Sequence, residues 1–246
     1  MIQQLEPRVL LAAAFPEFVD PNPNAGNNFG HSVVALSTGN VVITSPFDDA
    51  GGTDAGAVYL FNGATGALIS TLTGSTANDA VGLNGVTALS NGNYVVRSTN
   101  WDLDATHIGV GAVTFGDGMT GVSGAVSAAN SLVGSTTGDS VGDFGVTALS
   151  NGNYVVRSIN WNLDATHTDV GAVTFGSGTT GISGAVSAAN SLVGSTTGDQ
   201  VGSSGVTVLS NGNYVVSSMN WDGASLNVGA VTFGSGTTGI SGAVSA

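Results

Sequence analysis

Carboxylate side chains gather in one repeated segment of this sequence, and they are its best candidates for chemistry. An Asp-x-Asp pair such as Asp102 and Asp104, together with backbone carbonyls, offers the hard oxygen ligands that calcium prefers. Asp104 and His107 have the i, i+3 spacing that could hold a transition metal. The alternative is that these aspartates are solvated turn residues, a role that Asp favours. The candidate metal ligands are Asp48, Asp49, Asp54, Asp102, Asp104, Asp164 and Asp222.

Three tryptophans lie close to these aspartates. Trp101, Trp161 and Trp221 occupy one position of a repeat, and Phe47 holds it at the first occurrence. Aromatic rings that line a groove could stack on sugars, which makes the tryptophans candidate ligand-stacking residues. The alternative is packing between neighbouring repeats, where such a side chain buries roughly 150–250 Å².

The residues for covalent or acid–base catalysis are scarce. The sequence has no cysteine, and its histidines, His31, His107 and His167, lie without a matching Ser and Asp partner set. Glutamate occurs only at positions 6 and 17. An enzyme usually builds one site from different residues, whereas this chain duplicates one loop. The sequence therefore predicts a protein that is not an enzyme.

The charge balance limits the partners. Sixteen acidic residues face three arginines and no lysine, which gives a formal net charge of −13. Nucleic-acid backbones and anionic lipid surfaces both require clustered cations, so both are excluded as partners. An acidic surface favours divalent cations, cationic partners or solubility alone. Without cysteine, the chain has neither disulfides nor thiolate metal sites.

Internal repetition is the main feature of the chain. Residues 81–140 and 141–200 align without a gap and differ at ten positions. A third copy covers 201–246, and a more divergent copy covers 29–80. We call these, in chain order, units 1 to 4 (29–80, 81–140, 141–200 and 201–246).

Each unit carries strand signals of the same kind. In unit 2, the runs 85–89 and 94–98 flank the turn 90–93, whose Asn-Gly pair is a strong hairpin signal. A third strand is expected at 111–115 and a weaker fourth one between residues 122 and 133. Four antiparallel strands per unit predict an all-β, β-propeller-type repeat protein of four-stranded blades. A β-solenoid is the alternative.

Two segments resemble known repeats. Residues 29–33, 40–46 and 54–61 of unit 1 resemble an FG-GAP repeat, the blade type of integrin α-subunits and of many bacterial surface proteins. The later units are similar to a bacterial surface-protein repeat of unknown function. This resemblance implies a propeller fold and an extracellular location. The calcium loop that FG-GAP blades commonly carry does not transfer, because the corresponding turns at 37–40, 90–93, 150–153 and 210–213 contain no carboxylate.

The N-terminal residues form a separate segment. Leu5 to Leu11 resembles the LEPRxLL motif of exported planctomycete proteins, which implies that residues 1–20 are an export segment. The apolar run 9–15 is too short for a transmembrane helix, which needs roughly 20 residues. Residues 21–28 are expected to be a linker or a strand that closes the last unit. The other possibilities for four units are an open arc that self-associates through its strand edges, and a fragment.

The sequence therefore predicts a secreted or cell-surface bacterial protein with structural or adhesive work and no cofactor. The alternative is a calcium- or glycan-binding module that uses the Asp and Trp loops. Its partner would be an unknown surface protein or glycan.

Overall fold

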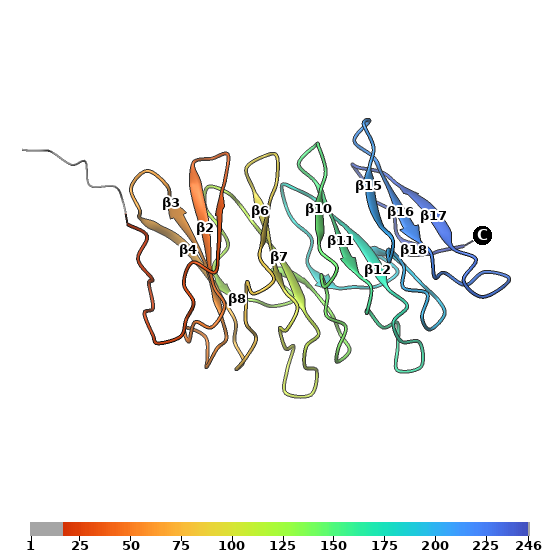
Figure 1. The fold of residues 1–246 in the computed structure, drawn as a ribbon, viewed down its shortest axis with the longest axis horizontal. Helices are drawn as coiled ribbons and strands as arrows, with labels where there is room; N and C mark the ends of the chain where they lie inside the picture. Colours follow the sequence, from red (N-terminus) through yellow and green to blue (C-terminus); the bar gives the residue numbers. More distant parts are fainter. Residues whose placement is uncertain (1–16, 246) are drawn as a thin grey trace, which may run out of the picture.

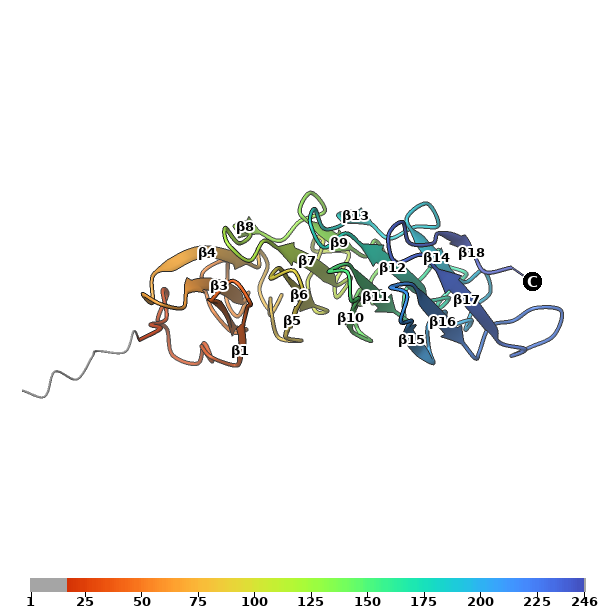
Figure 2. The ribbon, with the colours of Figure 1, turned by 90° about the horizontal axis from the view of Figure 1, so that it is seen from above.

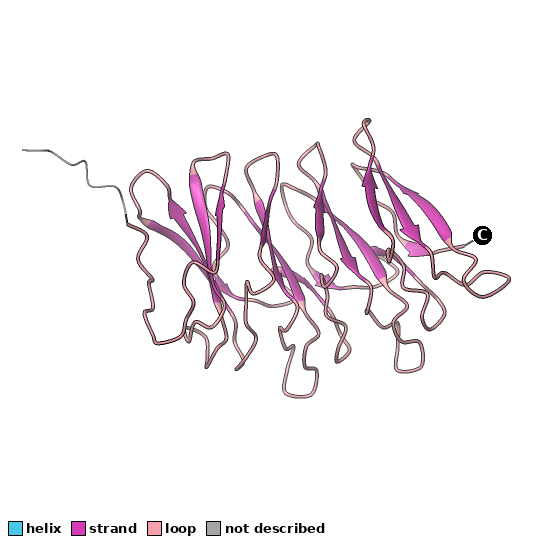
Figure 3. Cartoon of the chain, viewed as in Figure 1, coloured by secondary structure: helices cyan, strands magenta, loops and turns pink. Residues whose placement is uncertain are grey.

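The repeat units form an open, elongated row. The structure, a computed structural model, describes residues 17–245, and strands are the only extended regular elements in that range (Figures 1 and 3). Four sheets follow one another along the row, and none of them closes into a barrel. The described chain begins at one end of the row and finishes at the other (Figure 1). The predicted all-β repeat fold with antiparallel hairpins is confirmed.

The sheets share one pattern of strands. In each unit three consecutive strands pair antiparallel. The pairing between the second and the third strand is the longest, as between Tyr94–Ser98 and Ala112–Gly116. The strands are β1 (Ser32–Ala35), β2 (Asn40–Ser45), β3 (Ala57–Asn62) and β4 (Leu68–Thr73) in unit 1; β5 (Val86–Ala88), β6 (Tyr94–Ser98), β7 (Ala112–Gly116), β8 (Gly124–Ala125) and β9 (Ser131–Val133) in unit 2; β10 (Val146–Ala148), β11 (Tyr154–Ser158), β12 (Ala172–Gly176), β13 (Gly184–Ala185) and β14 (Ser191–Val193) in unit 3; and β15 (Gly205–Val208), β16 (Tyr214–Ser218), β17 (Ala230–Gly234) and β18 (Gly242–Ala243) in unit 4.

A short strand of each later unit joins the sheet of the unit before it. β8 of unit 2 pairs in parallel with β4 of unit 1, and β13 and β18 repeat this pairing with β9 and β14 (Figure 2). Three of the sheets therefore have five strands, of which the fifth comes from the next unit. The sequence predicted one weak fourth strand between residues 122 and 133, whereas the structure has two short strands there that belong to different sheets.

The hydrophobic core lies between successive sheets. Because side chains alternate along a strand, Tyr94 and Val96 of β6 face unit 1, whereas Val95 faces unit 3. Each of these side chains is at most 1% exposed. The ring of Tyr94 lies across Gly116 on the paired strand, where a Cβ atom would come within 2.1 Å of it. Glycine at this strand end is therefore required by the tyrosine.

The N-terminal end of the row carries an aromatic cap. Phe18 packs edge-on against Phe61, with ring centroids 5.4 Å apart, and Phe29 lies 6.0 Å from Tyr59. These rings cover the outer face of unit 1. Residues 21–28 contain no strand and lie at this end of the row, away from unit 4 (Figure 1). In this structure they therefore do not close the last unit. Residues 1–16, with the LEPRxLL-like motif, lie outside the described residues.

The hairpin turns at 37–40, 90–93 and 150–153 connect neighbouring units as well as strands. Asn40 donates from Nδ2 to the carbonyl of Gly118 in the next unit at 2.8 Å. Asn93 and Asn153 make the same contact with Gly178 and Gly236, at 2.7 and 2.8 Å. Asn91 and Asn151 donate to the same two carbonyls, both at 2.6 Å. We call these the turn amide contacts; they occur at all three unit boundaries.

We expect the turn amide contacts to contribute measurably to stability. Asn153→Ala removes the contact with Gly236 and also an acceptor for the amide of Gly178, 2.8 Å away. Asn213→Ala in unit 4 removes only the second kind of bond, to the amide of Gly236. Urea denaturation followed by tryptophan fluorescence should show a loss of about 1–2 kcal/mol for Asn153→Ala and a smaller loss for Asn213→Ala. Equal losses would contradict a role for Asn153 between units.

Candidate functional site

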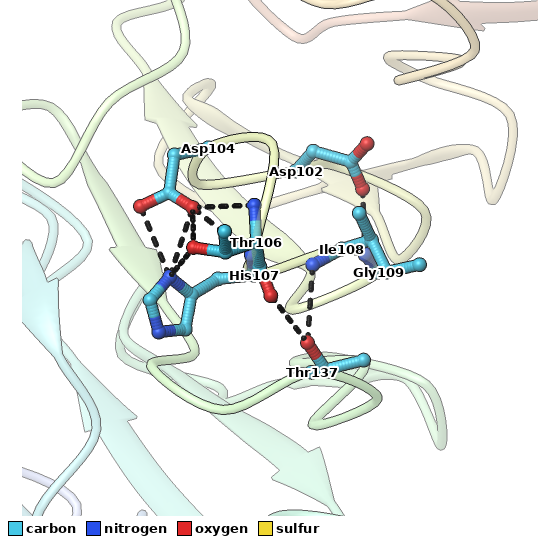
Figure 4. Close-up of polar contacts among 7 residues, drawn as sticks. All are labelled: Asp102, Asp104, Thr106, His107, Ile108, Gly109 and Thr137. Atoms are coloured by element: carbon cyan, nitrogen blue, oxygen red, sulfur yellow. Dashed lines mark hydrogen bonds and ion pairs between the residues drawn. The ribbon is translucent and has the colours of Figure 1, made fainter.

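The exposed aspartate loop of unit 2 is the region that the sequence marks for chemistry. Asp104 Oδ1 accepts hydrogen bonds from the amide and hydroxyl of Thr106 at 2.8 and 2.6 Å, and from the amide of His107 at 3.0 Å (Figure 4). His107 Nδ1 lies 2.9 Å from the same oxygen. The hydrogen bonds from Thr106, followed by that from His107, hold the pKa of Asp104 well below its usual range. The carboxylate therefore stays ionised and organises its own turn.

Unit 3 repeats this arrangement. Asp164 accepts from the amide and hydroxyl of Thr166 at 2.8 and 2.7 Å, and His167 Nδ1 lies 2.9 Å away. A neighbouring segment holds each loop in place, as Thr137 donates to the carbonyl of Thr106 at 3.1 Å (Figure 4). Asp104 and His107, paired by their i, i+3 spacing, are therefore in contact, and Asp164 and His167 repeat this contact in unit 3.

The remaining candidate ligands also bind groups of their own loops. Asp102 accepts from the amide of Gly109 at 2.6 Å, and Asp222 from that of Asn227 at 2.6 Å. Asp49 accepts from the amide of Asp54 at 2.9 Å. Each of these bonds joins a carboxylate to a backbone amide five or seven residues further along, so these carboxylates hold their own loops together.

Asp48 has a different environment from the other candidates. It is fully buried, and its Oδ2 accepts from the Tyr59 hydroxyl at 2.6 Å. Asn22 donates to Oδ1 at 2.8 Å and Asn27 to Oδ2 at 3.4 Å. Burial raises the pKa of Tyr59, and the hydrogen bond to Asp48 raises it further, so the phenol remains a donor. Asp48 therefore anchors the N-terminal segment on unit 1.

The structure does not bring the seven predicted ligands together. Within residues 17–245 no group of three or more His, Asp or Glu side chains is close enough to hold a metal ion. The pairs that do form are Asp104 with His107 and Asp164 with His167.

The tryptophans lie in the core, which corrects the stacking hypothesis. Trp101, Trp161 and Trp221 are 3, 2 and 7% exposed, and each belongs to the cluster between its own unit and the preceding one. A sugar could not reach the ring faces without separating two sheets. Packing between units, the alternative expectation, is the role that the structure gives them.

Three buried aspartates, one in each of units 1 to 3, occupy equivalent sites that residue spacing did not predict. Asp139 Oδ2 accepts from the amides of Ser135 and Thr136 at 2.9 and 2.8 Å, and its Oδ1 accepts from the amide of Asn162 at 3.0 Å. Asp79 and Asp199 bind the equivalent amides, and all three carboxylates are fully buried. Burial raises the pKa of Asp139, and the three amides oppose that shift. The sequence feature that marks these sites is an Asp at the end of the turns 77–79, 136–139 and 196–199.

The two arginines of the described residues serve as contacts between units. Arg157 donates to the carbonyls of Phe144 and Gly202 at 2.6 and 3.3 Å, and Arg97 binds the equivalent Asn84 and Gly142. Burial lowers the pKa of Arg157, and burial raises the pKa of nearby Asp143 to about 6. Both guanidinium groups therefore donate to backbone carbonyls of their own unit and of the next one.

The fold and these loops define the class of protein. It is a β-repeat protein whose successive sheets pack face to face, and whose repeated polar side chains bind the chain itself. Residues 88–143, 148–203 and 208–246 match a family described as a repeat of unknown function (DUF5650), and residues 17–61 match the FG-GAP repeat. The first family covers more than half of the chain, so the protein belongs to it.

These matches confirm the two resemblances. FG-GAP repeats are often extracellular structural or adhesion modules and are typically not catalytic. No curated protein matches the sequence. Among the described residues, no helix is long and apolar enough to span a membrane.

The buried and exposed aspartates should respond differently to the same substitution. Asp139→Asn places an amide NH₂ against backbone N–H donors in a buried site, so we expect a loss of about 2–3 kcal/mol in the free energy of unfolding. Asp164→Asn, on the exposed loop, should cost much less, because this surface substitution leaves no buried polar group without a partner. Urea denaturation of both variants gives the comparison. Equal small effects would mean that the buried carboxylates do not hold the loops together.

Proposed function

We propose that this protein is a non-enzymatic extracellular or cell-surface scaffold, which works as a spacer or as an adhesion module. Its repeats hold an extended shape, and its acidic surface keeps it soluble. Its partner would be a surface protein or a glycan.

One observation carries this proposal. Polar side chains that are shared by two or more units bind neighbouring loops or the next unit, as with Asn153, Arg157 and Asp139. Within the described residues, the exposed Asp–His pair occurs only in units 2 and 3, whereas a duplicated active site would present the same reactive groups to solvent in each unit. The repeated polar residues thus hold neighbouring units together, which favours a structural role over a catalytic one.

The family match supports the extracellular part of the proposal. FG-GAP repeats are commonly extracellular. The motif at residues 5–11 agrees with export, and its role is part of the same proposal.

Surface exposure can be tested on intact source cells. Protease treatment without lysis, followed by immunoblotting, should remove the protein while a cytoplasmic marker persists. A protein that is digested only after lysis would contradict the location. Small-angle scattering of the purified chain should give an elongated particle, and a compact one would contradict the spacer role.

Calcium binding is the alternative, and the exposed carboxylates of Asp104 and Asp164 support it. These side chains are 52 and 51% exposed on a chain of net charge −13. A ligand that binds only the folded state stabilises it, by about 2.7 kcal/mol at a hundredfold excess over Kd.

We expect thermal melts in millimolar calcium and in chelator to coincide, because the loop carboxylates already accept several hydrogen bonds. The double variant Asp104→Asn, Asp164→Asn provides the control. A higher Tm in calcium that disappears in this variant would favour the calcium-binding module over the scaffold.

A further inference from the structure

Three strands of identical sequence have very different surroundings. β7, β12 and β17 all read Ala-Val-Thr-Phe-Gly. Val113 and Val173 are fully buried, whereas Val231, at the same position in unit 4, is 75% exposed. Phe233 is 55% exposed, and its counterparts Phe115 and Phe175 are partly buried against the next unit. Because the sequences are identical, the difference comes only from what covers the strand.

The internal boundaries show what covers this face. Val173 lies in one cluster with Tyr214, Val216 and Trp221 of the following unit. The first residue of that unit, Val201, is fully buried, and its amide donates to the carbonyl of Val170 at 3.0 Å. Val141 makes the same bond to Val110 one unit earlier. Each outer face therefore receives a valine at one end and a tyrosine–valine strand across its middle.

Unit 4 presents a hollow where that valine would lie. Its lining includes Ser217, Val228, Gly229 and Val231, and its volume is about 270 Å³. Val228 corresponds to Val110 and Val170, which are fully buried, yet it is 54% exposed. In units 2 and 3, the carbonyl at this position accepts a hydrogen bond from the first valine amide of the next unit.

The polar half of the boundary is also present on unit 4. Asn213 accepts from the amide of Gly236 at 2.9 Å, as Asn153 does from Gly178, so the turn has the same conformation. Within residues 17–245, the Nδ2 groups of Asn211 and Asn213 have no acceptor, whereas those of Asn151 and Asn153 bind Gly236. Unit 4 thus offers both the apolar face and the two donors.

We propose that the outer face of unit 4 is a docking site for a further repeat unit of the same family. The occupant presents a Val-Gly pair to the hollow, a Tyr-Val-Val strand to Val231 and Phe233, and a glycine carbonyl to Asn211 and Asn213. This surface is an addition to the proposed scaffold function, and its existence does not depend on where the protein is located.

The N-terminal aromatic cap argues against a second copy of the chain as the occupant. Head-to-tail stacking of two copies would need the outer face of unit 1, which Phe18 and Phe29 cover. A second copy could then meet unit 4 only through its own unit 4, which offers amide donors in place of the glycine carbonyl. Unit 4 lacks the arginine of units 2 and 3, because Ser217 stands at that position. The arginine is not required for docking, since unit 1 has Thr44 there and is still covered by unit 2.

A single thiol can report on the occupancy of the face, since the chain has no cysteine. The full chain is compared with a version extended after Ala246 by a second copy of residues 189–246, which continues the repeat in register. Both carry Val231→Cys, and reaction with a maleimide is followed over time. Val173→Cys is the buried control, and Thr179→Cys is the exposed one.

We expect the extension to slow labelling of the Val231→Cys thiol at least about tenfold, because labelling then requires local opening of the boundary. Asn213→Ala in the extended chain should restore part of the rate. Equal rates in the two chains would overturn the proposal. Protection already present in the unextended chain, rising with concentration and with a doubled mass in light scattering, would identify a second copy as the occupant and also overturn it.

Discussion

The central strands of each unit are apolar on both faces, and this constraint governs the rest of the structure. In β6 and β11 the alternating side chains Tyr, Val and Val are all buried, so each sheet needs a neighbour on either side. A sheet of this kind cannot form a core alone, and stacking buries what a single unit would expose. The row of sheets is therefore the smallest arrangement that covers these strands.

The polar residues follow from that stacking. Loops that cross from one sheet to the next leave backbone amides and carbonyls away from water, and each of these groups must find a partner. The buried Asp79, Asp139 and Asp199 satisfy amides of the loops, while Arg97 and Arg157 satisfy carbonyls. Duplication of the unit copied this whole set of hydrogen bonds, which explains why repeated aspartates need not indicate a repeated ligand.

The two end sheets of the row each have an apolar face without a neighbouring sheet, and these two faces differ. Unit 1 replaces the Thr and Gly of β7 with Tyr59 and Phe61 on its outer face, and Phe18 and Phe29 cover them. Unit 4 keeps the sequence of an internal unit on its outer face, where Val231 and Phe233 are exposed. The two ends of the row therefore differ. The unit 1 end is covered by aromatic side chains, whereas the unit 4 end exposes a face like those at the internal boundaries.

Local sequence determined most of the strands and turns. The Asn-Gly turns, the alternation of β6 and β7 and the 60-residue period are readable because they depend on neighbours a few residues apart. The aspartate loops were found for the same reason, including the contact of Asp104 with His107.

Only the tertiary structure decided how the units join. The parallel pairing of β8 with β4 links segments about 50 residues apart through two residues, too few to leave a periodic signal. Burial of Trp101 and Asp139, and exposure of Val231 in a strand identical to β7, depend on which sheet lies opposite. Sequence alone determined the repeated unit and its hairpins, whereas the direction of stacking, the role of each loop aspartate and the open face arose from contacts between units that are distant along the chain.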